Sequence, residues 1–232
     1  MIALEAVDLA KEYTGGDGGT ITVLDGVSLE VPRGQMVAVV GASGAGKSTL
    51  LHLLGALDKP TRGSVRIAGE TVDGRSDEEL SALRNRSIGF VFQFHHLLRE
   101  FSALENVMMP LLIAGWNESR AKTRAESLLA RVGLAGRTQH RPAELSGGEQ
   151  QRTAVARALA IDPAVLLADE PSGNLDHANS ERLHDLFSEL SRDLEIAMVI
   201  ATHNRSLAAR ADRTLLLEDG HLTDTDVREV VP

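Results

Sequence analysis

Short, almost uninterrupted hydrophobic runs recur along the chain, at Met36–Val40, Val165–Ala168, Ala197–Ala201 and Thr214–Leu217. Continuous apolar and β-branched runs are typical of strands that are buried on both faces of a sheet. Between the last three runs the spacing becomes helical, with one apolar stripe that consists of Leu183, Leu186, Phe187, Leu190 and Leu194. Strands that alternate with helices predict an α/β fold with a mostly parallel sheet covered on both faces.

The N-terminal region and the middle of the chain depart from this alternation. Ile2–Leu9 and Thr20–Val31 have strand patterns separated by a glycine-rich turn, which indicates a small β subdomain. Residues 95–160 contain no convincing strand but have three helical patterns, at Ala103–Ala114, Glu118–Val132 and Gly148–Ala160. We expect a single domain of residues 1–232, in which a helical subdomain of residues 95–160 is inserted into a core of residues 1–94 and 161–232.

Composition excludes several classes of site and partner. The 232 residues include no cysteine, which excludes disulfides, zinc–thiolate sites and a thiol nucleophile. The formal net charge of −9 argues against nucleic acid as a partner, because sequence-independent binding requires a basic face. The longest apolar stretch, Val107–Trp116, is too short to span a bilayer, so we expect a cytoplasmic chain that reaches a membrane only through partners.

The sequence after Met36–Val40 fits the phosphate-binding pattern G-x-x-x-x-G-K-[ST], with a strand before it and a helix after it. Its glycines let successive backbone N–H groups point at phosphate oxygens, and the helix N-terminus adds partial positive charge. Lys47 can reach the β- and γ-phosphates, and the Ser48 hydroxyl can ligate Mg²⁺. We expect the nucleotide to contact Gly41, Ala42, Ser43, Gly44, Ala45, Gly46, Lys47, Ser48 and Thr49. The loop alone does not distinguish a kinase, a GTPase and a transport ATPase.

Two carboxylates, Asp169 and Glu170, end the apolar run that begins at Val165. The carboxyl ends of parallel strands are where α/β sheets bind their ligands. Asp169 suits a magnesium site, and Glu170 suits a base that polarises the attacking water. The structural alternative is a solvated acidic strand end, but a phosphate loop requires an acidic residue at such a strand.

A second glycine-rich helix start lies at Leu145–Arg152, with the sequence LSGGEQQR. Ser146, Gly147 and Gly148 precede a helix, so their N–H groups form a second site suited to an anion. Two anion sites far apart in one domain suggest that two copies of the chain meet across shared ligands. The alternative, in which Ser146 only caps the helix, is also physically sound.

Together, LSGGEQQR and the phosphate loop resemble the motifs of ABC ATPases, and the similarity extends over essentially the whole chain. The resemblance implies a P-loop NTPase (RecA-like) parallel-sheet core with an N-terminal antiparallel β subdomain and an inserted α-helical subdomain. It implies ATP and Mg²⁺ as cofactors. It also implies a head-to-tail homodimer in which Ser146, Gly147 and Gly148 contact the γ-phosphate held by the opposite subunit.

Four further positions match the family in chain order. Tyr13 resembles the aromatic residue that stacks on adenine. Gln93, after a strand at Ile88–Phe92, resembles the glutamine that senses Mg²⁺ and water. Asp176 resembles the D-loop aspartate at the dimer interface, and His203 resembles the switch histidine that hydrogen-bonds the γ-phosphate.

The resemblance therefore implies four catalytic residues, which are Lys47, Gln93, Glu170 and His203. It implies metal contacts from Ser48, Gln93 and Asp169. Two positions depart from the commoner family residues: Ser172 stands in place of threonine, and Asn204 stands in place of aspartate. Both changes are small and leave the catalytic interpretation intact.

Within the family, Phe92–Leu98 and Leu104–Leu112 resemble the lipoprotein-releasing (Lol) group, and the pair His95-His96 favours it. The resemblance implies two transmembrane permease subunits of the Lol type and a peripheral position at the cytoplasmic face of the inner membrane. Efflux of macrolides or peptides and a role in cell division are alternatives, since those relatives share the Gly173–Asp176 stretch. A non-transport ABC protein, a small-molecule P-loop kinase and a nucleotide-gated regulator fit the motifs less well.

Overall fold

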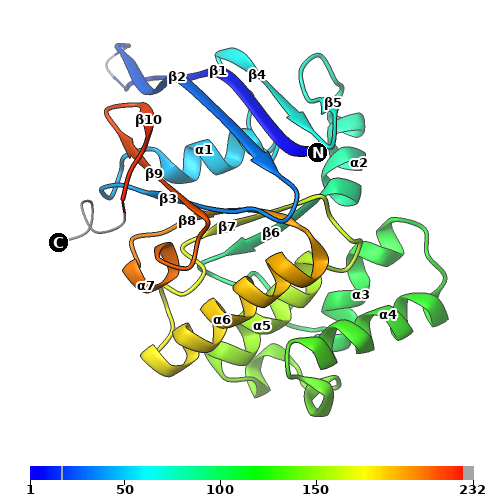
Figure 1. Ribbon diagram of the computed structural model, residues 1–232. Helices are drawn as coiled ribbons and strands as arrows, with labels where there is room; N and C mark the ends of the chain where they lie inside the picture. Colours follow the sequence, from blue (N-terminus) through cyan, green and yellow to red (C-terminus); the bar gives the residue numbers. More distant parts are fainter. Residues whose placement is uncertain (17, 227–232) are drawn as a thin grey trace.

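In the computed structural model, which describes residues 1–16 and 18–226, a six-stranded sheet runs through the centre of the molecule (Figure 1). The strand order is β10-β9-β3-β8-β7-β6, with five parallel strands and β10 antiparallel at one edge. The strands are β3 (Met36–Val40), β6 (Ile88–Phe92), β7 (Val165–Asp169), β8 (Ala197–Ala201), β9 (Arg213–Glu218) and β10 (His221–Asp224). The mostly parallel sheet predicted from the hydrophobic runs is confirmed.

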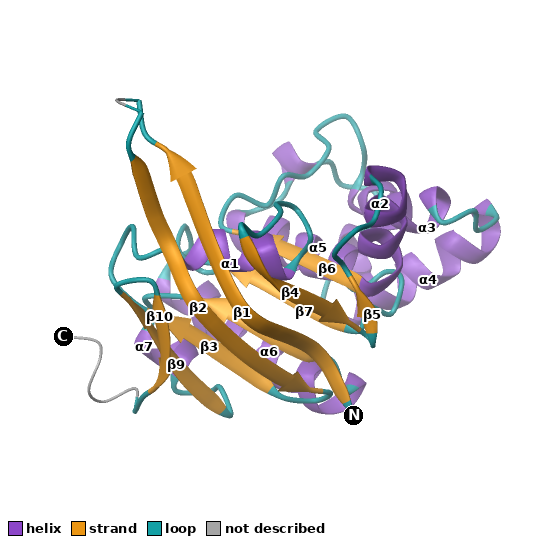
Figure 2. Cartoon of the chain, turned by 90° about the horizontal axis from the view of Figure 1, so that it is seen from above, coloured by secondary structure: helices purple, strands orange, loops and turns teal. Residues whose placement is uncertain are grey.

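A second, antiparallel sheet has the order β2-β1-β4-β5. It consists of β1 (Ile2–Thr14), β2 (Thr20–Pro32), β4 (Arg62–Ile67) and β5 (Glu70–Thr71). Figure 2 shows the long β1–β2 hairpin in front of the six-stranded sheet. The predicted strand Ile2–Leu9 was too short, because β1 continues to Thr14 and pairs with β2 as far as Thr20, with register shifts along the way.

Helices cover both faces of the six-stranded sheet (Figure 1). α1 (Lys47–Leu54) lies between the two sheets, whereas α5 (Gly147–Ala158) and α6 (His177–Leu194) cover the opposite face. The remaining helices are α2 (Asp77–Ser87), α3 (Ala103–Ile113), α4 (Glu118–Arg131) and α7 (Arg205–Ala208), with 3₁₀ turns at Ala135–Arg137 and Pro142–Glu144.

The continuous apolar strands supply two separate cores, because successive side chains point to opposite faces. In β7, Val165 and Leu167 pack between the two sheets with α1, whereas Leu166 and Ala168 pack against the helices on the other face. All four side chains are at most 1% exposed. This two-sided burial fixes the strand whose end carries the acidic residues.

The segment 95–160 contains α3, α4 and α5 and no strand, as the helical patterns predict. Its buried side chains, such as Leu111 and Leu129, belong to the same hydrophobic cluster as Leu166 of the central sheet. The subdomain boundaries stay predictions. Over the described part of the chain, none of the helices combines the length and the hydrophobicity needed to cross a membrane.

Candidate functional site

The loop between β3 and α1 has the backbone that a phosphate cradle requires. Gly46 caps α1 with φ of 99°, and a Cβ there would lie 2.9 Å from a methyl carbon of Val23. Gly41 has φ of 156°, and a Cβ there would collide with the carbonyl oxygen of Leu217. Because neither position tolerates a side chain, both glycines are required for the tight turn that aims the start of α1 at the loop.

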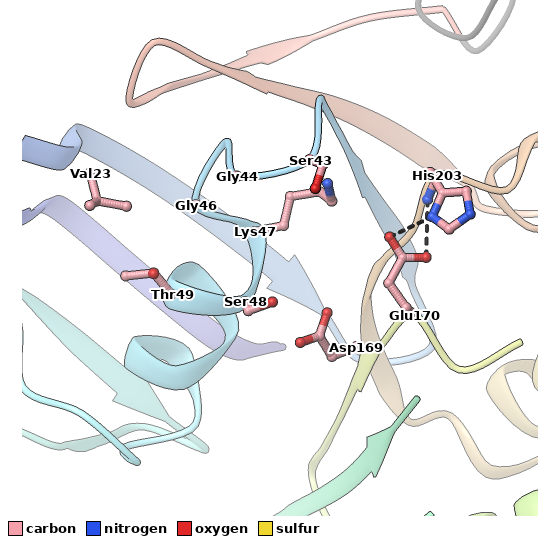
Figure 3. Close-up of a pocket in the computed structure, with 10 residues that line it drawn as sticks. All are labelled: Val23, Ser43, Gly44, Gly46, Lys47, Ser48, Thr49, Asp169, Glu170 and His203. Carbon is pink, nitrogen blue, oxygen red and sulfur yellow. Dashed lines mark hydrogen bonds and ion pairs between the residues drawn. The ribbon is translucent and has the colours of Figure 1, made fainter. Parts of the chain in front are cut away.

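A cavity of about 430 Å³ opens over this loop, which is within the usual range for ligand sites (Figure 3). Residues of the loop and of α1 line one side, and the ends of β7 and β8 supply the other. The lining residues are Val23, Ser43, Gly44, Gly46, Lys47, Ser48, Thr49, Asp169, Glu170 and His203. The structure thus brings together most of the predicted phosphate loop, both acidic residues and the histidine.

Lys47 is the cation of this cavity and is only 9% exposed. Its Nζ donates to the carbonyl oxygens of Gly41 at 2.8 Å and of Ala42 at 2.9 Å. An ammonium group has three N–H donors, so one remains for a ligand oxygen. Gly41 and Ala42 therefore hold the lysine through their carbonyl groups.

The carboxylates of Asp169 and Glu170 emerge where β7 ends, next to β6 on one side and β8 on the other. Glu170 has φ of 44°, a left-handed backbone that is uncommon for a residue with a side chain. Its N–H donates to the carbonyl oxygen of Ala201 at 2.9 Å, which holds this conformation in place. Unusual backbone at a strand end is a feature of functional positions.

His203 pairs with Glu170 through two contacts, drawn as dashed lines in Figure 3. The His203 backbone N–H donates to Glu170 Oε2 at 3.2 Å, and His203 Nδ1 lies 2.9 Å from Oε1. The histidine side chain is 71% exposed, whereas the glutamate is 17% exposed. The imidazole can therefore move towards a ligand while the carboxylate stays in place.

Ser146 lies outside the residues that line this cavity and caps α5. Its hydroxyl oxygen accepts the N–H of Glu149 at 3.3 Å, while its own N–H donates to Glu149 Oε2 at 2.8 Å. The Ser146 hydroxyl also donates to Glu149 Oε2 at 2.9 Å, and the two hydrogen bonds that the Ser146 N–H and hydroxyl donate to this carboxylate lower the pKa of Glu149. The capping role considered for Ser146 is confirmed, and its contact with a second subunit stays a prediction.

Gly147 and Gly148 form the first turn of α5. A Cβ at Gly148 would lie 2.5 Å from Oδ1 of Asn179, so the glycine allows α5 and α6 to approach closely at this point. Asn179 is held by the side chain of Asp176, which accepts its backbone N–H at 2.9 Å. The structure therefore brings the predicted signature and D-loop residues together within one chain.

Gln93 and Tyr13 also lie outside the residues that line the cavity. Gln93 exchanges two hydrogen bonds with Asn174: its Nε2 donates to Oδ1 at 3.1 Å, and the asparagine donates back to the Gln93 carbonyl oxygen at 3.3 Å. Tyr13 donates its hydroxyl to Asp58 Oδ2 at 3.1 Å, with the ammonium of Lys11 4.9 Å from its ring centroid.

Val23 and Asn174 were not among the predicted site residues. Val23 lines the cavity from β2, and its strand was predicted without any indication of which side chain would face the loop. Asn174 lay inside the predicted D-loop, and its partner Gln93 is 81 residues away in the chain. No local pattern identifies a pair with that separation.

Comparisons with known proteins place these observations in a family. The sequence profile described as "ABC transporter" matches residues 24–173. The chain is 56% identical over 220 residues to the "Lipoprotein-releasing system ATP-binding protein LolD" of Geobacter metallireducens, covering 94% of this chain and 97% of the relative. The protein of the same name from Bordetella pertussis is 54% identical, with 95% of both chains covered.

Solved structures give the same result. The ATP-binding cassette MJ0796, described as a dimer in a post-hydrolysis state bound to ADP and Pi, superposes with a TM-score of 0.88 at 36% identity, over 97% of this chain and 99% of the other. The profile match covers more than half of the chain, and the relatives cover nearly all of it. This chain belongs to the ABC transporter family.

Proposed function

We propose that the chain is the ATP-hydrolysing subunit of an ABC transporter that releases lipoproteins from the inner membrane. The convergence of Lys47, Asp169, Glu170 and His203 in one cavity is the observation that carries the hydrolytic part. Relatives named as LolD over nearly the full length support lipoprotein release as the transport step.

Hydrolysis needs a base beside the γ-phosphate. In the proposed reaction, the oxygen of water attacks the γ-phosphorus, the bond to the β–γ bridging oxygen breaks, and Glu170 accepts the water proton. Its carboxylate is held at the cavity by β7 and by His203. Lys47 stabilises the negative charge on the phosphate oxygens, and His203 donates to the γ-phosphate once the nucleotide is bound.

The oxygen donors in the cavity fit Mg²⁺. The Ser48 hydroxyl and the Asp169 carboxylate line the same cavity, and both are the hard oxygen ligands that this ion prefers. Residues 1–16 and 18–226 hold no group of three or more His, Cys, Asp and Glu side chains placed to bind a metal. That fits an ion held by few protein ligands and by phosphate oxygens. Bound Mg²⁺ supplies charge neutralisation of the β- and γ-phosphates, and Gln93 would sense it from the loop after β6.

We assign the second half of each site to a partner copy. Ser146, Gly147 and Gly148 lie outside the lining of the cavity, which a head-to-tail homodimer would explain. A solved relative is described as a dimer. In that arrangement, the signature residues of one subunit contact the γ-phosphate held by Lys47 of the other, and Asp176 lies at the interface. Tyr13 is assigned separately, as the residue that stacks on adenine.

An apolar surface beside α3 supports docking of membrane subunits. Five large hydrophobic side chains of residues 94–113 are exposed, namely Phe94, Leu98, Phe101, Leu112 and Ile113. Two of them, Leu98 and Ile113, line a groove of about 350 Å³ whose lining also includes Phe90, Phe92, Met109 and Pro110. We propose that two permease subunits of the Lol type dock on this surface, one on each copy of the homodimer, and hold the chain at the cytoplasmic face of the inner membrane.

The buried side chain of Asn106 shapes the loop on this surface. Its Oδ1 accepts the N–H of Leu98 at 2.8 Å, and its amide donates to the carbonyl oxygens of Leu98, Phe101 and Ser102. Arg157 holds the start of the loop by donating to the carbonyl oxygens of His95 and His96. A preorganised apolar loop is suited to bind a helix from a partner.

The direct test is to reconstitute the chain with its membrane partners in liposomes. We expect ATP-dependent transfer of an acylated protein to a carrier protein. Phe101→Glu should abolish transfer and co-purification while basal hydrolysis remains, and Val7→Glu, an exposed apolar position on β1, is the matched control. A complex that exports a small amphiphile but never releases a lipoprotein would favour the efflux function instead.

A further inference from the structure

α6 contains a histidine, His184, whose side chain is fully buried. Its Nε2 lies 2.9 Å from the hydroxyl oxygen of Ser172, which is itself only 6% exposed. Ser172 comes two residues after Glu170 and begins the loop that leads to Asp176. One end of the imidazole ring therefore contacts the segment that carries the proposed general base.

The other ring nitrogen, Nδ1, lies next to Glu181 of the same helix. His184 Nδ1 has no hydrogen-bond partner among the described residues and lies 3.5 Å from Oε1 of Glu181, one turn earlier in α6. Glu181 accepts the hydroxyl of Ser206 at 2.7 Å. Ser206 is in α7, three residues after His203, and α7 packs against α6. Two hydrogen bonds, Ser172–His184 and Ser206–Glu181, thus reach from α6 to the two catalytic loops, and a 3.5 Å approach of His184 to Glu181 connects them.

The charges around the ring determine which of its two nitrogens carries the proton, and so which one donates and which one accepts. Burial lowers the pKa of His184 and outweighs the opposing attraction of Glu181 and Asp185, while Arg210 lowers it further, so the ring is neutral. Hydrogen bonds from Ser206 and Arg210 lower the pKa of Glu181 to about 2 and keep it ionised. A neutral ring beside a carboxylate is most stable with its proton on Nδ1, which leaves Nε2 to accept the Ser172 hydroxyl.

We propose that His184 is a positioning residue for ATP hydrolysis, which links Ser172 to Glu181 and Ser206 and so holds the Glu170 and His203 loops in register. This role rests on the proposed function of those two residues. It explains why a polar ring occupies a fully buried site of α6, where an apolar side chain of similar volume would pack without any need for hydrogen-bond partners.

The order Ser172, His184, Glu181 is also that of a hydrolytic triad. A nucleophile must reach its substrate, and exposures of 6% for Ser172 and 0% for His184 prevent that contact. The arrangement therefore acts through the loops that it joins and not through a covalent step of its own.

Steady-state ATP hydrolysis of four variants tests the proposal. His184→Leu should lower kcat about tenfold with KM for ATP within about twofold of wild type, because the loops move while the phosphate loop does not. His184→Gln keeps one donor and one acceptor and should recover kcat to within about threefold of wild type. Ser172→Ala should resemble His184→Leu, and the double variant should be no slower than either single variant, since both remove one network.

Ser191→Ala is the matched control. It removes another buried hydroxyl from α6, one that donates to the carbonyl oxygen of Gly34 at 3.2 Å and is remote from both loops. Its kcat should equal that of wild type. A wild-type kcat in folded His184→Leu, equal losses in His184→Leu and His184→Gln, or additive effects in the double variant would overturn the positioning role. Absence of hydrolysis by the wild-type complex would instead reject the proposed function.

A readout that leaves His184 in place covers the case in which His184→Leu does not fold. Long-range ¹⁵N–¹H spectra of the histidine rings should show a neutral His184 with its proton on Nδ1, and this signal should shift when ATP binds to the Glu170→Gln variant. A proton on Nε2, or a signal unchanged by ATP, would contradict the proposal.

Discussion

The starts of α1 and α5 are both glycine-rich helix N-termini, but the side chains next to their N–H groups differ. α1 begins after Gly46 with no side-chain cap and no acidic residue in its first turn. α5 begins after Ser146 with a complete capping box, in which Glu149 supplies a carboxylate. The first start leaves its amides available to a phosphate, whereas the second already contains an anion from its own chain.

From this difference we propose that nucleotide binds first at the α1 start. The α1 start lies in a cavity with a cation and two carboxylates, so one chain alone provides a binding site for a nucleotide. At the α5 start, the Ser146 hydroxyl lies 2.9 Å from Glu149 Oε2. A γ-phosphate would have to compete with that carboxylate, so we propose that the α5 start contributes only when a second subunit brings the phosphate close to it.

The largest expected effect is on chemistry at the α1 cavity. Glu170→Gln should lower kcat by about 10²–10⁴, because it removes the base and keeps the volume of the side chain. Nucleotide binding should remain, and the variant should accumulate as an ATP-bound dimer, as measured by size-exclusion chromatography and crosslinking with Mg²⁺-ATP. Hydrolysis close to the wild-type rate would reject Glu170 as the base.

Lys47→Ala should weaken nucleotide binding as well as lower kcat, by about 10²–10³, since the lysine is the cation that lines this cavity. Fluorescent-nucleotide titration and phosphate release measure the two effects separately. If turnover stayed within a few-fold of wild type, the α1 start would not be the phosphate site.

The sequence predicts the α1 site well because strand, loop and helix are adjacent in the chain. Runs such as Met36–Val40 match β3 residue for residue, and the loop after it needs only local backbone geometry. β4 and α2 were missed because each is short or exposed. Val65 and Ile67 are the buried side chains of β4, and only Leu80, Leu83 and Ser87 are buried in α2.

Features that depend on distant residues could not be predicted from the sequence. The contacts of Gln93 with Asn174 and of His184 with Ser172 form only when β6, β7 and α6 pack together. Neither has a characteristic spacing in the chain. The part of the site that a second subunit would supply was suggested by the two separate anion sites and by the family resemblance, and a single chain leaves Ser146 in its capping box.

Mixing two inactive variants tests whether the α1 start and the α5 start of one active site come from different subunits. A Lys47→Ala subunit paired with a Ser146→Ala subunit retains one site in which both elements are intact, if the dimer is head-to-tail. Half of the randomly formed dimers are mixed and each has one intact site of two, so about a quarter of wild-type hydrolysis should return. No gain on mixing, with mixed dimers verified by crosslinking, would show that each chain completes its own site.

The smallest expected effect is on the free energy of unfolding. It tests the carboxylate of Glu149, which belongs to the capping box of α5 and has no counterpart at the start of α1. Hydrogen bonds from Ser146 lower the pKa of Glu149, so its contribution to stability is present above the unfolded pKa, near 4.5, and is lost as the pH falls through the folded value. Glu149→Gln should therefore unfold about 1 kcal/mol more easily at pH 7, and this difference should shrink as the pH drops below about 4.5.

Urea unfolding of wild type and Glu149→Gln between pH 3 and pH 7 measures this difference. Glu118→Gln in the first turn of α4 is the control, because the cap of that helix is Asn117 and involves no carboxylate. The same Glu149→Gln variant should keep or raise its affinity for a partner's phosphate, because the competing anion at the α5 start has been removed. A stability difference that is independent of pH would mean that Glu149 acts through packing, and the contrast between the two helix starts would then lose its electrostatic basis.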